Sequence, residues 1–126
     1  IEGTCLNVGK YDSTISTDRF LYCVKNALGG TVRHNNIEKC IKNIAVCSGS
    51  GSDYLDMAKE FDCDVLLTGD ASHHAFLDAN EMGILLVAAG HFETENISIK
   101  PLADRISKEF KAECVIAKQN TPIITI

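Results

Sequence analysis

The sequence predicts an α/β fold, with helices packed in layers on a mostly parallel β-sheet. Short apolar runs alternate along the chain with segments of helical spacing, which is typical of βαβ units. The runs are continuous rather than alternating, as in strands buried on both faces of a parallel sheet. The chain has 126 residues, 45% of them hydrophobic, which is enough for one core. We therefore expect residues 1–126 to form a single α/β domain.

The first part of the chain is expected to hold a helix at residues 17–28, because apolar side chains recur there on one face and Gly29 follows as a stop. A short strand is expected at residues 31–33. Residues 44–47, Ile-Ala-Val-Cys, predict the first buried strand. Residues 52–61 predict a helix, with Ser52 as a candidate cap.

The second part repeats this alternation. Residues 65–68 predict a strand, residues 73–82 a helix ended by Gly83, and residues 84–88 a strand. A longer helix is expected from about residue 95 to 110, with Pro101 in its first turn or at a kink. Two further strands are expected at residues 114–117 and 122–126.

Charge and cysteine content exclude several classes of function. The chain has 12 Lys and Arg against 17 Asp and Glu, a net charge of −5 with no basic patch, so we expect no nucleic acid partner. The longest uncharged apolar run, residues 84–90, is far shorter than the ~20 residues of a membrane span, so we expect no membrane association. Six scattered cysteines without a CxxC pair argue against a disulfide framework or a four-thiolate zinc site. A cytoplasmic location follows as an expectation.

Ligands of parallel α/β sheets gather at the carboxyl ends of the strands, and three of the four histidines follow such ends. His91 and Glu95 are four residues apart, so on a helix they share a face and either hold a metal ion or form an exposed pair; spacing alone favours the pair. Asp70, His73 and His74 follow the second buried strand. Each alone fits a cap or a surface residue, but as a group they indicate function.

Two further features at this edge have simpler interpretations. The loop at residues 48–52, Ser-Gly-Ser-Gly-Ser, is either an anion cradle or a tight turn with a serine cap, and the absence of a full phosphate-loop motif favours the turn. Cys47 precedes this loop and is expected to be buried strand filler. Asp78 lies on the side of His74 and is expected to orient its ring.

Four strings resemble the C-terminal half of the Nif-three-like dinuclear-metal proteins, often called GTP cyclohydrolase type 2 homologues. They are AVCSGSGS at residues 45–52, TGD at 68–70 followed by His73 and His74, LDA at 77–79, and GHFETE at 90–95. The resemblance extends over residues 1–126 and implies one half of a two-lobed Nif-three-like fold. The resemblance implies that the chain lacks the N-terminal half, as a fragment or one partner of a split protein, and a start without Met agrees with a truncated piece.

The resemblance implies that His91 and Glu95 are metal ligands, which reverses the interpretation from spacing alone. The intact protein would hold two divalent ions of the zinc, iron or manganese class, with the other ligands, a His-His pair and an Asp, supplied by the missing N-terminal half. His74 matches a recurrent cavity histidine of the family, so we take His74 and Asp70 as candidate catalytic residues. Family members often have Asp after that histidine, whereas Ala75 stands here.

The expected function is that of part of a metal-dependent hydrolase acting on a nucleotide-like or other small substrate. The alternative is a non-catalytic protein that binds or delivers metal, or serves as a scaffold. The resemblance also implies a homo-oligomer, such as a ring. This segment alone is expected to be inactive.

Overall fold

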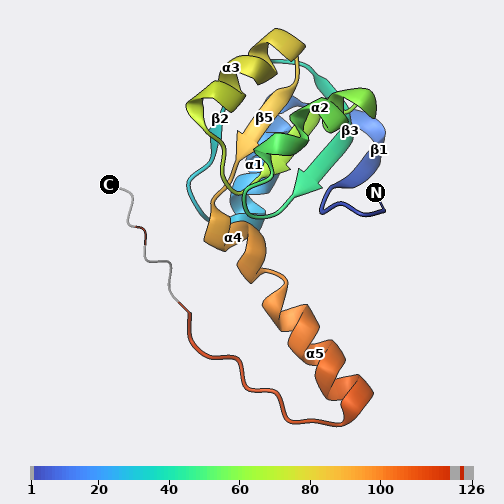
Figure 1. Ribbon diagram of the computed structural model, residues 1–126, viewed down its shortest axis with the longest axis vertical. Helices are drawn as coiled ribbons and strands as arrows, with labels where there is room; N and C mark the ends of the chain where they lie inside the picture. The colour runs from blue at the N-terminus through green and yellow to red at the C-terminus, as the bar shows by residue number, and fades with distance from the viewer. Residues whose placement is uncertain (1, 120–122, 124–126) are drawn as a thin grey trace.

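The computed structural model of the protein describes residues 2–119 and Ile123, and its centre is a five-stranded sheet (Figure 1). The strands are β1 (Asn7–Ser16), β2 (Arg33–His34), β3 (Cys40–Cys47), β4 (Val65–Thr68) and β5 (Leu85–Ala88). The helices are α1 (Thr17–Leu28), the short 3₁₀ helix η1 (Ser52–Tyr54), α2 (Leu55–Glu60), α3 (His73–Met82), α4 (His91–Asn96) and α5 (Ile99–Phe110). The strand order across the sheet is β1-β3-β4-β5-β2.

The sheet is mixed, so the layered α/β prediction is confirmed but its mostly parallel character is only partly right. The inner strands β3, β4 and β5 are parallel. Both edge strands are antiparallel, β1 on β3 and β2 on β5. Continuous apolar runs identify strands that are covered on both faces, whereas edge strands of this sheet are largely exposed and leave no such signal.

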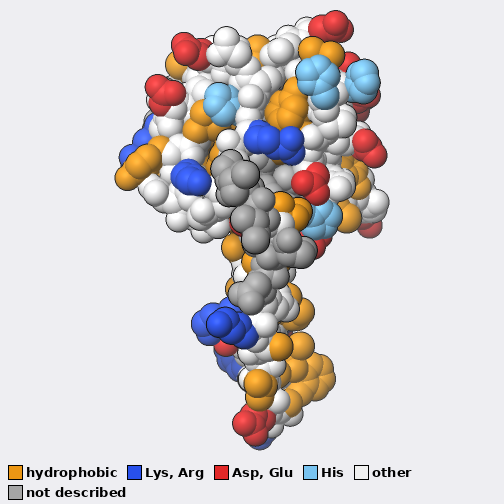
Figure 2. Space-filling view, turned by 90° about the vertical axis from the view of Figure 1, so that its left-hand side faces the viewer, with side chains coloured by type: hydrophobic (Ala, Val, Ile, Leu, Met, Phe, Trp, Pro, Cys, Tyr) orange, Lys and Arg blue, Asp and Glu red, His pale blue; other side chains and the backbone are white. Residues whose placement is uncertain are grey.

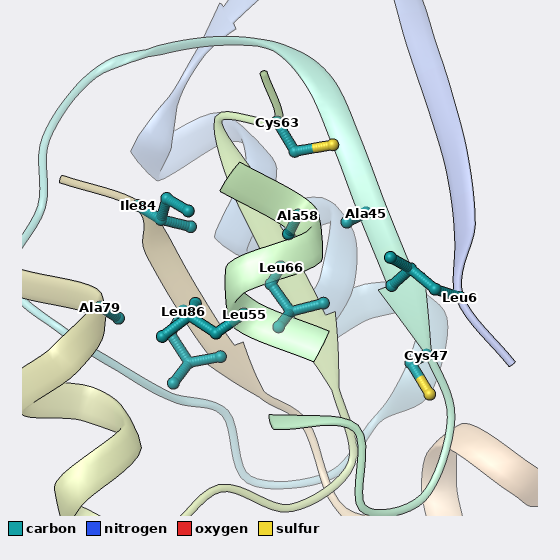
Figure 3. Close-up of a cluster of buried hydrophobic side chains, with 10 residues drawn as sticks. All are labelled: Leu6, Ala45, Cys47, Leu55, Ala58, Cys63, Leu66, Ala79, Ile84 and Leu86. Carbon is teal, nitrogen blue, oxygen red and sulfur yellow. The ribbon is translucent and has the colours of Figure 1, made fainter. Parts of the chain in front are cut away.

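Helices cover both faces of the sheet, which makes three layers. Residues of β4 and β5 point alternately to the two sides, so each strand contributes to two separate cores. The core under α2 and α3, drawn in Figure 3, contains Leu55, Ala58, Leu66, Ala79 and Leu86 among others. The core under α1 is built by Phe20, Val24, Ile41, Val65, Leu85, Val87 and Ala89. Burial on both faces explains why the inner strands read as unbroken apolar runs.

The helices α1 and α3 begin and end where the sequence predicts. Ser16 caps α1 by accepting a hydrogen bond from the Arg19 backbone N–H, and Gly29 ends it in the left-handed conformation. Ser72 caps α3 by accepting from the Ala75 N–H, and Gly83 ends it in the same way. These caps fix both ends of the two helices.

Two expected helices are each divided into two. The helix at residues 52–61 consists of η1 and α2; Gly51 is the N-cap residue of η1, and the side-chain cap expected from Ser52 is not formed. The helix expected at about 95–110 is replaced by α4 and α5, with a break at Ile97 and Ser98. Pro101 stands in the first turn of α5, where its missing N–H costs least.

Helix α5 projects from the body of the molecule with no buried residue, as Figure 1 shows. Its apolar stripe is exposed, including Leu102, Ile106 and Phe110. Figure 2 shows hydrophobic side chains gathered on this projecting part. Two i,i+4 ion pairs, Lys100–Asp104 and Arg105–Glu109, lie along the same helix.

The sequence also predicts one strand that is not formed and misses one that is. Residues 114–117 have no regular secondary structure, and Val115 is 86% exposed, so the strand expected there is wrong: its apolar residues find no strand to pair with in the described part of the chain. The strand expected at 122–126 lies outside the described residues apart from Ile123. The edge strand β1 was not expected from the sequence because its residues are mostly polar and exposed.

The cysteines form no disulfide bonds, and no helix among the described residues could span a membrane. All six cysteines are free, and Cys47 is buried at the end of β3, as expected of strand filler. Burial raises the pKa of the Cys47 thiol, and the nearby Cys5 adds to the effect. Within residues 2–119, no helix is long and apolar enough to cross a bilayer.

Asp64 ties the start of β4 to β3 and offers a first test of the fold. Its Oδ2 accepts hydrogen bonds from the backbone N–H groups of Lys42, at 2.8 Å, and Asn43, at 2.9 Å, while its Oδ1 lies 3.4 Å from the Lys39 ammonium. Partial burial by itself would raise the pKa of Asp64, but these hydrogen bonds and the Lys39 charge outweigh it and lower the pKa below the ordinary 3.8.

We expect Asp64→Ala to lower the free energy of unfolding by about 2 kcal/mol at pH 7, because two backbone donors lose a charged acceptor. A carboxyl with a lowered folded pKa stabilises the fold above its unfolded pKa and loses that effect as the pH falls through the folded value. Urea unfolding should therefore show a constant difference from wild type between pH 5 and 7 that shrinks below about pH 3.8. A difference that grew on acidification would contradict this role.

Candidate metal centre at the carboxyl edge of the sheet

Backbone hydrogen bonds join the three loops that follow β3, β4 and β5. The Gly49 carbonyl accepts from the N–H groups of Gly69 and Asp70, both at 2.9 Å. The Gly90 N–H donates to the Gly69 carbonyl, also at 2.9 Å. Because parallel strands end at one edge of the sheet, segments that are about twenty residues apart in sequence meet there.

At this edge, the His91 ring lies between two carboxylates. Its Nδ1 is 2.7 Å from Asp70 Oδ2, and its Nε2 is 3.2 Å from Glu95 Oε1. His91 begins α4, so Glu95 follows one turn later on the same face, as the spacing predicts. All three side chains are about half exposed. The result is a chain of three ligand-type side chains, Asp–His–Glu, open to solvent.

The two carboxylates change the acidity of the ring. The hydrogen bond that His91 Nδ1 donates to Asp70 is the main cause that raises the pKa of His91; slight burial opposes it, and the charges of Glu95 and Asp70 add to the increase. Hydrogen bonding at Nδ1 to a carboxylate also favours the proton on Nδ1 when the ring is neutral. The Nε2 lone pair then faces Glu95.

Gly49 sits where the loop after β3 meets the Glu95 side chain. Its φ is +66°, and a Cβ at this position would stand 2.7 Å from Glu95 Oε1 and 3.4 Å from His91 Nε2. The backbone conformation therefore favours glycine, and any Cβ here would displace the Glu95 carboxylate from its present position. The Gly49 N–H donates to Thr94 Oγ1 at 3.2 Å, which joins the loop to α4.

Thr68, at the end of β4, is hydrogen-bonded to the same loop. Its buried Oγ1 accepts from the Gly51 N–H at 2.8 Å and donates to the Gly49 carbonyl at 3.0 Å. The N–H groups of Gly49 and Gly51 are thus used within the protein. This supports the interpretation of residues 48–52 as a tight turn rather than an anion cradle.

The other predicted site residues lie apart from His91. His73 and His74 are exposed in the first turn of α3, with ring centroids 6.3 Å apart. His74 lines a different hollow together with Asp53, Asp56 and Asp78. Among the described residues, we find no hydrogen bond between His74 and Asp78 and none from either histidine to the Asp–His–Glu chain. The structure thus brings together Asp70, His91 and Glu95, but not His74.

The sequence did not predict the structural roles of Gly49, Thr68 and Thr94, or the direct contact between Asp70 and His91. Thr68 and Thr94 belong to the motif strings at residues 68–70 and 90–95, and both are hydroxyl residues next to a strand end. A hydroxyl residue next to a strand end, within a motif string, is the sequence feature that could have identified them. Within the described residues, no group of three or more His, Cys, Asp or Glu side chains converges on one point to hold a metal ion. His91 separates the two carboxylates instead.

Fold and site together define a three-layer α/β protein with ligand-type side chains at the carboxyl edge of its parallel strands. A family model, Duf34/NIF3 (NGG1p interacting factor 3), matches residues 3–122. The chain belongs to this family, which confirms the resemblance seen in the sequence.

Individual relatives agree with the family assignment. The chain is 39% identical over 70 residues to a Haemophilus influenzae protein named GTP cyclohydrolase 1 type 2 homolog, covering 56% of this chain and 28% of the relative. A Pseudomonas aeruginosa protein of the same name is 36% identical over 90 residues, covering 71% and 36%. The crystal structure of Staphylococcus aureus protein SA1388 superposes with a TM-score of 0.80 at 26% identity, covering 94% of this chain and 36% of that one. The chain thus spans well under half the length of these relatives.

Proposed function

We propose that this chain supplies His91 and Glu95 as ligands of a divalent-metal centre that belongs to a metal-dependent hydrolase of nucleotide-like or other small substrates. The observation that carries the proposal is the separation of 3.2 Å between His91 Nε2 and Glu95 Oε1, with Asp70 at the opposite ring nitrogen. The name GTP cyclohydrolase 1 type 2 homolog, borne by its relatives, supports the choice of substrate class.

The donor set fits a transition-metal ion. Imidazole nitrogen and carboxylate oxygen bind zinc, iron and manganese at about 2.0–2.2 Å, so two such ligands of one ion stand about 3.0–3.5 Å apart. The His91–Glu95 separation lies in this range. A metal-binding histidine also usually donates its other N–H to a carboxylate, and Asp70 is in position to accept it.

Two ligands are fewer than a catalytic site needs, so we propose that further ligands come from outside this chain. The length of the relatives supports this, because the chain matches only 28% and 36% of two of them. The same reasoning extends the proposal to two ions and to a homo-oligomeric assembly of the whole protein. Bound ions of this kind supply a water of lowered pKa and polarise the substrate.

The residues of this chain would orient the centre and handle protons beside it. Asp70 holds the proton on His91 Nδ1 and fixes the direction of Nε2. Gly49 leaves room for the Glu95 carboxylate, and Thr94 connects that loop to α4. His74 lines a different hollow, so we assign these tasks to Asp70 and His91 rather than to His74.

The test is metal affinity. It is measured for this chain alone, and again after adding, as a separate polypeptide, the part of a family member to which this chain has no counterpart. We expect His91→Ala and Glu95→Ala to weaken zinc or manganese binding at least about 100-fold, because each removes a direct ligand. Asp70→Asn should weaken it about 10- to 100-fold by misorienting the ring. His73→Ala is the matched control and should leave affinity unchanged.

Binding that ignores both ligand substitutions, or no binding in any form, would contradict the metal centre. Turnover then separates the enzyme from a protein that only binds or delivers metal. Stoichiometric metal without hydrolysis of a panel of nucleotides and esters would contradict the hydrolase and leave the metal-binding role.

A further inference from the structure

A hollow of about 280 Å³ opens directly beside His91. Its lining includes Arg33, Gly69, Asp70, Gly90, His91 and Phe92. We propose that Arg33 binds an anionic group, a phosphate or a carboxylate, of the small molecule that reaches this edge of the sheet. The inference rests on the proposed function and deepens it, because it names the chemical class of the substrate.

The fold carries Arg33 to this place from a distant part of the sequence. Strand β2 pairs with β5 so that Arg33 lies opposite Ala88, two residues before Gly90. The buried Asn35 fixes this pairing: its amide donates to the Ile84 carbonyl and its side-chain oxygen accepts from the Leu86 N–H, both at 2.8 Å. Arg33 is therefore held at the carboxyl edge by buried hydrogen bonds.

The guanidinium of Arg33 lies near an aromatic ring and forms no ion pair with a described carboxylate. Its Cζ lies over the Phe76 ring, 5.9 Å from the ring centroid, within range of a cation–π interaction. Among the described residues, no carboxylate comes within salt-bridge distance of it. A guanidinium held near an aromatic ring, whose N–H groups have no acidic partner, is suited to bidentate binding of an oxyanion.

Charged side chains of both signs line the hollow. Two carboxylates line it, Asp70 and Glu93, and Asp70 is paired with His91. Glu93 lies against the backbone of Gly30: its Cγ is 2.7 Å from where a Cβ on Gly30 would stand. Arg33 is the one Lys or Arg in the described lining. An anionic group in the hollow is thus attracted by Arg33 and repelled by the carboxylates.

The test uses metal-free protein, so that anion binding is measured independently of the metal centre. Phenyl phosphate, benzoate and phenol are titrated while the Arg33 Nε–H resonance is followed by NMR. We expect at least one of the two anions to shift this resonance and to bind at least about tenfold more tightly than phenol. The two anion arms show whether phosphate or carboxylate is the preferred group.

Arg33→Gln should weaken binding of that anion about tenfold, since one charge-assisted fork is lost. The matched control is Arg19→Gln: the Arg19 Cζ also lies over an aromatic ring, 5.7 Å from the Tyr22 centroid, but Arg19 is on α1. Equal binding of phenol, no effect of Arg33→Gln, or the same loss in Arg19→Gln would overturn the proposal. The effect of His91→Ala on metal binding tests only the metal centre. Each of the two proposals can therefore be contradicted without the other.

Discussion

A Thr68→Val variant is expected to lose about 2–3 kcal/mol of unfolding free energy and, with it, the geometry of the candidate site. Valine has nearly the shape of threonine but no hydroxyl. The substitution leaves the Gly51 N–H buried without its acceptor and takes one donor from the Gly49 carbonyl. Leaving a buried backbone donor unsatisfied costs about 1–3 kcal/mol, and the lost hydrogen bond adds to it.

The consequence for the site follows from the position of Gly49 beside Glu95. If the loop moves, the contact between Glu95 and His91 changes, and metal affinity should fall together with stability. Urea unfolding and metal titration of the same preparation measure both. For stability, Thr94→Val is the matched comparison, because Thr94 is half buried and water can replace its hydroxyl. A Thr68→Val protein as stable as wild type would contradict the role of this hydroxyl.

The largest loss of stability is expected from Leu66→Ala, at about 3–4 kcal/mol. Leu66 is fully buried in β4, the middle strand, and packs in the core under α2 and α3. Truncation removes apolar contacts and leaves a cavity that the surrounding helices cannot close completely. Because total stability of a domain is about 5–15 kcal/mol, this single change would remove a large share of it.

The control for this prediction is the same substitution at an exposed position. Leu102 on α5 is 55% exposed, so Leu102→Ala should change the unfolding free energy by less than about 1 kcal/mol. Thermal or urea unfolding of both variants gives the comparison. Similar losses at the two positions would show that α5 is packed in solution rather than projecting.

The inner part of the fold could be predicted because burial shapes its sequence. Residues 65–68 and 73–82 coincide with β4 and α3, since strands covered on both faces must be apolar and helix ends need caps. The antiparallel edges could not be predicted in this way. Residues of β1 are mostly exposed, and pairing direction depends on tertiary contacts rather than on local composition.

The strand expected at residues 114–117 shows the opposite error. β-branched and apolar residues favour a strand, but a strand forms only where another strand supplies hydrogen bonds, and the described sheet ends at β1 and β2. The exposed Val115 shows that composition alone did not decide the outcome.

The candidate site was predicted in its parts but not in its connections. Motif strings pointed to Asp70, His91 and Glu95, and helical spacing placed Glu95 beside His91. The contact between Asp70 and His91 depends on the register of β4 against β5, which a single sequence does not reveal. The role of Gly49 likewise depends on a close approach between two loops.

The position of β2 has a consequence for the order in which the chain folds. Arg33 pairs with Ala88, 55 positions further along, and β2 has no other strand neighbour in the described sheet. Closing so long a loop loses chain entropy before any contact compensates for it, whereas the β3–α2–β4 and β4–α3–β5 units form from nearby residues. During synthesis β2 must therefore wait for β5 to leave the ribosome, and the wall of the hollow that carries Arg33 is among the last parts of the molecule to assemble.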